Sequence, residues 1–176
     1  MRKLKNEELG RISVEEFKKE TKLPLVIILD NVRSLNNVGA AFRTSDAFLV
    51  EKIYLCGITG TPPHREINKT ALGATESVAW EYVADILLLI EKIKKSGYKV
   101  ISIEQADEST SLLDFVPQKN MKYALVFGNE VFGVDEKAVE ASDHCLEIPQ
   151  HGTKHSLNIA VSIGIVVWDF YRKLGG

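Results

Sequence analysis

Three short segments hold most of the side chains in this sequence that could take part in chemistry. They are NNVGAAFRTSDAF (36–48), LVFGNEVFGV (125–134) and IPQHGTKHSLNIAVS (148–162). An arginine, a glutamate, a serine and asparagines can together bind anions and hold polar groups in place. The arginine remains protonated, so it suits a phosphate group better than the role of general base. The candidate residues are Asn37, Arg43, Glu130, Ser156 and Asn158.

Each candidate also has a structural explanation. Arg43 could pair with an aspartate three positions further along a helix, and Asn37 stands near an expected helix start, where asparagine is a good N-cap. Glu130 could anchor its loop by accepting backbone N–H bonds. Ser156 could cap the last helix, whereas Asn158 is expected inside that apolar helix, where a buried amide needs hydrogen-bond partners. For Arg43, residue type alone favours the structural interpretation, and for Asn37, Glu130 and Ser156 it leaves both interpretations open.

The elements that must position these residues alternate between strand and helix. LPLVIILD (23–30) is a continuous apolar run, typical of a strand buried on both faces, and Ser13 with Glu16 forms a capping-box pattern. The alternation predicts an α/β fold: a mostly parallel sheet with helices on both faces. Strands are expected at 23–30, 52–57, 77–83, 98–105, 122–130 and 144–150, and helices at 14–20, 37–48, 85–97, 135–141 and 156–174.

The expected strand ends bring the three segments together. Ligands of parallel sheets bind beyond the carboxyl ends of the strands, here the loops after residues 30, 105, 128 and 149. The usual nucleotide signatures are missing, since no GxGxxG follows a strand and GNEVFG (128–133) lacks the Lys-Ser/Thr of a P-loop. These loops therefore need another explanation.

Composition excludes several classes of protein. The net charge of −2 and pI near 6.1 argue against nonspecific coating of nucleic acid. Cys56 and Cys145 form no CxxC pair and are expected to be buried free thiols. A nearby proline and glycine predict a loop around His151 and His155, so we expect no metal site. No signal peptide is evident, and no apolar run reaches the roughly 18 residues of a membrane span. A cytoplasmic protein with no membrane partner is expected.

The last expected helix (156–174) is apolar nearly all round. Such a helix must be buried on more than one side, and a domain of this size would hardly enclose it alone. We therefore expect it to pack against a second subunit.

In order and spacing, the three segments resemble the motifs of the SpoU family of RNA ribose 2′-O-methyltransferases, within the SPOUT superfamily. The resemblance covers roughly residues 23–174. It implies a C-terminal trefoil knot, which is so rare that periodicity would have predicted an open sheet. It also implies a homodimer, S-adenosyl-L-methionine as cofactor, a short N-terminal helical extension (1–22) and a methyltransferase domain (23–176).

The resemblance gives roles to the candidate residues. Arg43 matches the family's essential arginine and is expected to clamp a phosphate across the dimer interface, so that the phosphate or a water takes the proton. Asn37 would hold substrate or orient Arg43, Glu130 would anchor its loop or orient a partner, and Ser156 and Asn158 match the SLN of the third motif. Cofactor contacts, mainly from backbone, are implied for Ile103, Gly128, Ile148 and Leu157.

Three of these cofactor assignments also rest on residue type. Glycine at 128 allows a ligand to approach closely. Ile148 and Leu157 could wall the adenine ring, although each would serve equally well as ordinary core.

The expected reaction is methylation of a ribose 2′-hydroxyl in RNA. The IPQ…SLN segment followed by VVWDF is closer to members that modify the tRNA D-loop guanosine, and no separate N-terminal RNA-binding domain is evident. A tRNA substrate is therefore favoured over rRNA. Gln150 departs from the family, in which methionine is common. The alternatives are the same chemistry on rRNA, a noncatalytic RNA-binding module, and an enzyme acting on a small molecule.

Overall fold

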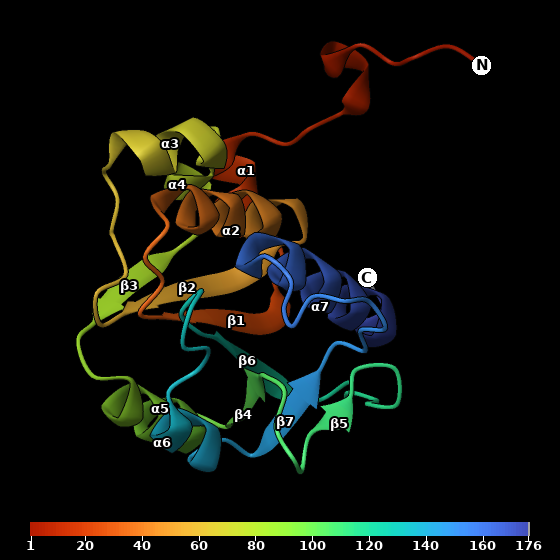
Figure 1. The fold of residues 1–176 in the computed structure, drawn as a ribbon. Helices are drawn as coiled ribbons and strands as arrows, with labels where there is room; N and C mark the ends of the chain where they lie inside the picture. Colours follow the sequence, from red (N-terminus) through yellow and green to blue (C-terminus); the bar gives the residue numbers. More distant parts are fainter. Residues whose placement is uncertain (176) are drawn as a thin grey trace.

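A single seven-stranded sheet forms the centre of the molecule, in a computed structural model that describes residues 1–175 (Figure 1). The strand order is β3-β2-β1-β6-β4-β7-β5, and every pairing between neighbours is parallel. The strands are β1 Leu23–Asp30, β2 Val50–Cys56, β3 Trp80–Val83, β4 Tyr98–Ile103, β5 Thr110–Ser111, β6 Lys122–Phe127 and β7 His144–Glu147.

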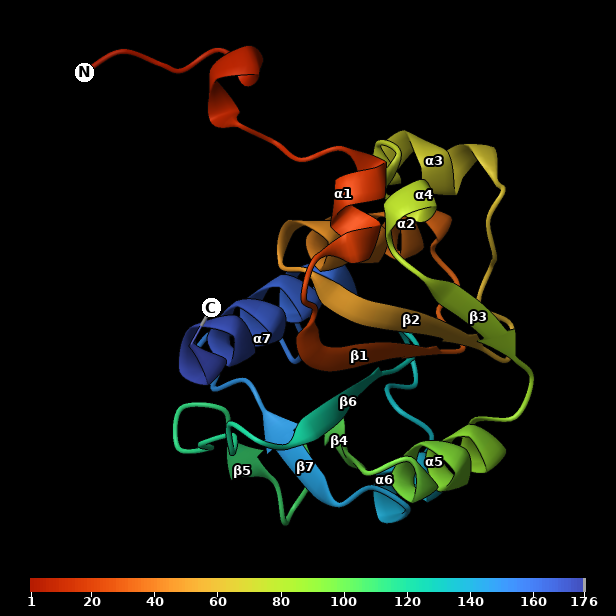
Figure 2. The same cartoon turned by 180° about the vertical axis from the view of Figure 1, so that it is seen from behind.

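Helices cover both faces of the sheet, and the two opposite views in Figures 1 and 2 show the same division. This arrangement confirms the predicted α/β architecture. One face is covered by α1 Val14–Lys19, α2 Leu35–Ala47, α3 Arg65–Ala71, α4 Ala74–Ser77 and α7 Ile159–Leu174, and the other by α5 Ile86–Lys95 and α6 Glu136–Glu140, while the 3-10 helix η1 Asn6–Leu9 precedes them.

The central strand β1 shows why its sequence is apolar without interruption. Successive side chains of a strand point to opposite faces. Leu25, Ile27 and Leu29 join the core beneath α2 and α7, whereas Val26 and Ile28 join a second core beneath α5 and α6. Both faces are therefore dry, as the sequence predicts for a parallel sheet.

The strand order also sets the position of the loops. Since all strands run the same way, the segments that follow β1, β4, β6 and β7 leave from one edge of the sheet. The connection from β6 to β7 passes the end of β4, which lies between them. The trefoil knot remains a prediction, as does the division of the chain at residue 23.

The sequence prediction is wrong between β2 and β3. No helix is expected between the strands at 52–57 and 77–83, but α3 begins at Arg65, capped by the His64 imidazole, and α4 ends at Ser77, the residue at which the second strand is expected to start. The helices are separated by Leu72 and Gly73, both with positive φ. Two helices of seven and four residues are too short to leave a helical period in the sequence.

The start of the last helix is a second correction. It was expected at 156, but α7 begins at Ile159, and the Oδ1 atom of Asn158 accepts the N–H of Ala160 at 2.9 Å as the N-cap. Ser156 therefore does not cap the helix, and Asn158 is exposed rather than buried. Asparagine is among the strongest N-caps, and the apolar period begins immediately after it.

One side of α7 stays open in the single chain. Ile163, Val166 and Phe170 are fully buried, but Val161 and Trp168 on the opposite side are about half exposed, at 49% and 53%. In the part of the chain that the structure describes, no helix is long and apolar enough to cross a membrane.

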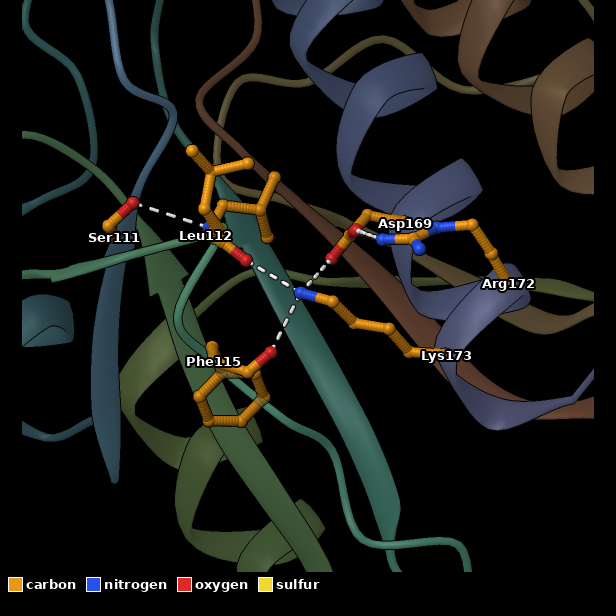
Figure 3. Close-up of polar contacts among 7 residues, drawn as sticks. Ser111, Leu112, Phe115, Asp169, Arg172 and Lys173 are labelled. Atoms are coloured by element: carbon orange, nitrogen blue, oxygen red, sulfur yellow. Dashed lines mark hydrogen bonds and ion pairs between the residues drawn. The ribbon is translucent and has the colours of Figure 1, made fainter.

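The C-terminal turn of α7 is fastened to the loop after β5 (Figure 3). The Lys173 ammonium donates to the carbonyl oxygens of Leu112 and Phe115, each at 2.7 Å. It also lies 2.6 Å from the Asp169 carboxylate, although that oxygen is not aligned for a hydrogen bond. Both charged side chains are only 13% exposed, so this contact is nearly buried.

We expect Lys173→Met to lower the free energy of unfolding by about 2–4 kcal/mol, because it leaves two carbonyl groups without their donor and Asp169 with only the exposed Arg172 as its partner. Urea unfolding followed by circular dichroism measures the change. Arg172→Met is the matched control, since Arg172 pairs with the same aspartate but is 61% exposed, and should cost at most about 1 kcal/mol. Equal losses in the two variants would contradict this account.

Candidate active site

A cavity of about 710 Å³ opens at the carboxyl edge of the sheet. Its size lies within the usual range for sites of small ligands, roughly 300–1,000 Å³. The lining combines apolar side chains with about as many polar ones, so it is more polar than most such sites. It comes from the ends of β4 and β6 and from the segments that follow β4, β6 and β7.

All four residues predicted to contact a cofactor line this cavity: Ile103, Gly128, Ile148 and Leu157. Ile103 and Ile148 also pack against the larger core. This is the core role that the sequence left open for Ile148, whereas Leu157 is 39% exposed. Their part in binding remains a prediction.

The structure shows why residue 128 must be a glycine, a reason that the sequence did not reveal. A Cβ atom there would lie 2.1 Å from the carbonyl carbon and oxygen of Gly133 and from the Val134 nitrogen. The loop after β6 thus returns against its own starting point. Any side chain at 128 would push the loop out of the cavity wall.

This loop, residues 129–133, is built around Asn129. The backbone groups of Asn129 and Gly133 exchange two hydrogen bonds of 2.8 and 2.9 Å. The Asn129 side chain accepts the N–H groups of Val131 and Phe132 and donates to the carbonyl oxygen of Asn31 at 2.7 Å. The loop is therefore fixed both to itself and to the end of β1.

Glu104 is a part of the site that sequence reasoning missed. Its carboxylate lies in the cavity wall and accepts the N–H of Val134 at 3.0 Å. The available signal was its position, directly after the end of β4 at the sheet edge where ligands bind.

Glu130 joins the other two motifs. Its carboxylate accepts the N–H groups of Arg33 and Ser34 and the side-chain amide of Asn37, each at 3.0 Å. Asn37 in turn accepts the amide of Asn158 at 3.3 Å. The segment before and at the start of α2, the loop after β6 and the residue before α7 thus share one chain of hydrogen bonds, and Glu130 anchors its loop, as one of the two interpretations proposes.

Ser34, not Asn37, caps α2. The Ser34 hydroxyl accepts the N–H of Asn37 at 3.3 Å, so the alternative that Asn37 is an N-cap is wrong. Its side chain is left for Glu130 and Asn158.

The ionisation of Glu130 follows from these contacts. Partial burial works to raise the pKa of Glu130, but the N–H groups of Arg33 and Ser34 and the Asn37 amide outweigh it and lower the pKa. The carboxylate is therefore charged at neutral pH and acts as an acceptor.

The structure does not bring Arg43 and Ser156 into this hydrogen-bond chain. Ser156 lines the cavity and is exposed. Arg43 is exposed on α2, outside the cavity lining, and within residues 1–175 it forms no ion pair, since the Asp46 carboxylate instead accepts the Ser77 hydroxyl. The expected pairing of Arg43 with Asp46 is wrong.

The described residues contain no cluster of three groups able to hold a metal ion. Cys56 is buried, Cys145 is half-buried, and neither forms a disulfide. Burial raises the pKa of Cys56 to about 12, so this thiol stays protonated and unreactive.

The fold and the site define a parallel α/β protein with a ligand cavity at the carboxyl edge of its sheet. The profile of the SpoU rRNA Methylase family matches residues 24–168. The chain belongs to this family.

Individual relatives are similar over most of the chain. A 23S rRNA (guanosine-2'-O-)-methyltransferase RlmB of Neisseria meningitidis is 30% identical over 150 residues, which cover 85% of this chain and 59% of the relative. A putative TrmH family tRNA/rRNA methyltransferase of Staphylococcus haemolyticus is 28% identical over 91% of this chain and 63% of the relative. The chain therefore spans about 60% of the length of these two relatives.

Solved structures share the fold. The TrmH/SpoU tRNA modifying enzyme of A. aeolicus superposes with a TM-score of 0.79 at 28% identity, covering 91% of this chain and 79% of that one. An AdoMet-bound rRNA methyltransferase from Sinorhizobium meliloti gives a TM-score of 0.81 at 24% identity over 91% of this chain and 61% of that one.

We expect Glu130→Gln to destabilise the protein by about 1 kcal/mol at pH 7, because an amide nitrogen would face an N–H donor in a partly solvated site. The folded pKa lies below the ordinary value of 4.5, so as the pH falls the unfolded chain takes up the proton first. The advantage of the wild type should be complete above about pH 5 and decline below 4.5.

Urea unfolding at pH 7 and at pH 3.5–4 measures this difference. Glu108→Gln, in an exposed loop, is the control and should change little at either pH. A difference that grows on acidification would show that the carboxylate is not stabilised by these donors.

Proposed function

We propose that this chain transfers a methyl group from S-adenosyl-L-methionine to a ribose 2′-hydroxyl of RNA. The observation that carries the proposal is the hydrogen-bond chain Glu130–Asn37–Asn158, which joins the three family motifs at the mouth of the cavity. A protein that only bound RNA would have little need for these polar groups beside a cavity sized for a small ligand.

The residues of the cavity fit the cofactor. Ile103, Ile148 and Leu157 offer apolar surface for an adenine ring, and the backbone at Gly128 is bare because no side chain fits there. The carboxylate of Glu104 supplies a negative charge in the wall of a site for a cationic ligand. When bound, S-adenosyl-L-methionine supplies an electrophilic methyl group on a positively charged sulfur.

Arg43 acts on the RNA in this proposal. Its guanidinium is a permanent cation with five donors, suited to holding a phosphate group in a fixed orientation. Held in this way, the phosphate or a water on it takes the proton of the ribose hydroxyl. Glu130 stays ionised and holds Asn37, while Asn158 and Ser156 face the substrate side of the cavity.

A second copy of the chain completes the site. Arg43 lies outside the cavity of its own chain, and the open apolar side of α7, with Val161, Ile165 and Trp168, is a surface for self-association. In a twofold dimer the same surface is used by both copies, so each Arg43 can serve the cavity of its partner.

We propose tRNA, at a D-loop guanosine, as the RNA and the cytoplasm as the location. The similarity to a TrmH/SpoU tRNA modifying enzyme supports tRNA. The relative named as a 23S rRNA methyltransferase makes rRNA the alternative that the experiment must separate.

Arg43→Ala should lower the rate of methyl transfer by about 10²–10³-fold, the usual effect of removing one group that stabilises developing charge. The measurement uses labelled S-adenosyl-L-methionine with unmodified tRNA and with rRNA, followed by alkaline digestion. Label in alkali-resistant dinucleotides marks 2′-O-methylation. The exposed Lys95→Ala, on α5 at the opposite face of the sheet, is the control and should retain the wild-type rate.

Three results would count against the proposal. Undiminished transfer by Arg43→Ala would remove the arginine from the mechanism. Label released as single nucleotides would mean methylation of a base. No transfer to either RNA, despite binding of the cofactor, would point to another substrate.

A heterodimer tests whether Arg43 acts across the interface. Arg43→Ala and Glu130→Gln chains are co-expressed with different tags and purified through both. If the arginine serves the partner's cavity, one of the two sites contains both native residues, and about half of the wild-type rate should return. If it serves its own cavity, both sites stay damaged and the rate stays at the level of the single variants.

A further inference from the structure

The tip of the loop after β6 presents two adjacent apolar side chains to solvent. Phe132 is 84% exposed and Val131 is 68% exposed, and both stand at the rim of the main cavity. A single exposed apolar residue needs no explanation, but an almost fully bare aromatic ring beside a ligand cavity does.

Flexibility does not explain this exposure, because the loop is held from three directions. Asn129 binds the N–H groups of Val131 and Phe132 and is tied to the end of β1. Glu130 is bound to the start of α2, and Glu104 holds Val134 on the other side. The backbone that carries Phe132 is therefore fixed, and its ring projects from a rigid support.

The neighbouring charge indicates what could cover the ring. Arg33 is exposed, and its backbone nitrogen lies 3.0 Å from the Glu130 carboxylate, so the chain that carries this cation is tied to the same loop. An exposed aromatic ring and an arginine on connected segments match a nucleotide, which combines a flat base with a phosphate.

Two other occupants fit less well. An adenine ring enclosed in the cavity would not need contact with a side chain as exposed to solvent as Phe132. A second copy of the chain already has a larger apolar surface on α7.

We propose that Phe132 is a base-stacking platform, against which an unpaired nucleobase of the RNA packs at the mouth of the cavity. The ring would then favour a nucleotide in a loop or an opened pair over one within a duplex, because bases inside a helix are already stacked. This inference rests on the proposed function, since it assumes an RNA substrate.

Binding of RNA is measured first, without any methyl transfer. A single-stranded oligoribonucleotide and the same sequence in a duplex are titrated against wild type and against Phe132→Ala, Phe132→Leu and Phe132→Tyr. Stacking on one aromatic ring corresponds to a roughly 5- to 100-fold change in affinity. We expect Phe132→Ala and Phe132→Leu to lose this factor for the single strand alone, and Phe132→Tyr to retain it. Leucine matters here because it keeps the apolar bulk and removes only the flat face.

The stack itself is observed with Phe132→Trp. Its fluorescence, compared with that of the wild type, should be quenched by the single strand and not by S-adenosyl-L-methionine alone. Quenching by the cofactor alone would assign the ring to adenine, and a change on dilution without RNA would assign it to an interface between copies. Either result overturns the proposal, as would equal binding by all the variants.

Methyl transfer by the wild type, run in parallel, separates this inference from the proposed function. If the wild type methylates RNA while Phe132→Ala has unchanged KM and kcat, the stacking inference fails and the function stands. If the single strand quenches Phe132→Trp but nothing is methylated, the function fails and the contact with RNA stands.

Discussion

The Glu130 carboxylate is the group on which the arrangement of the site depends. It is one side chain that accepts from the chain before α2, from the side chain of Asn37 and, through Asn37, reaches the start of α7. A neutral group could not accept all three donors at once. The charged carboxylate therefore links segments that the sheet brings close together but that no strand pairing connects. Glu104 does the same on the other side of the loop, so two carboxylates keep the cavity wall in place.

The sheet makes such links possible because its strands are parallel and their carboxyl ends lie at the same edge. With β6 between β1 and β4, the loop after β6 stands between the other two polar segments. The glycine at 128 allows this loop to fold back closely, and the buried cores on both faces keep the strand ends from shifting. At the C-terminal end of α7, Lys173 binds the loop after β5. The first residues of the same helix reach the site.

Much of the fold could be predicted from the sequence, since long apolar runs such as residues 23–30 have one explanation and the strand ends follow from it. The short helices α3 and α4 were not predicted, because each has too few residues to show the helical repeat of apolar positions. The candidate site residues were chosen by motif, and chemistry alone would not have singled out Arg43. Residue types could not show which of several possible hydrogen bonds form. Ser34, and not Asn37, is the N-cap of α2, and Asn158 is an N-cap instead of a buried amide. Glu104 was missed because one acidic residue after a strand resembles any surface residue until its partner, 30 positions away, is known.

The strand order has a consequence for how the chain is made. β1 can pair with β2 as soon as residue 56 has been synthesised, but its other neighbour, β6, begins only at residue 122. Until then a strand composed almost wholly of apolar residues has one open edge, and α7, which covers one face of β1, begins only at residue 159. Contacts between such distant parts of a sequence form slowly. During synthesis of the intervening residues this apolar strand therefore stays partly uncovered, and a chaperone that shields it over that interval would raise the yield of folded protein.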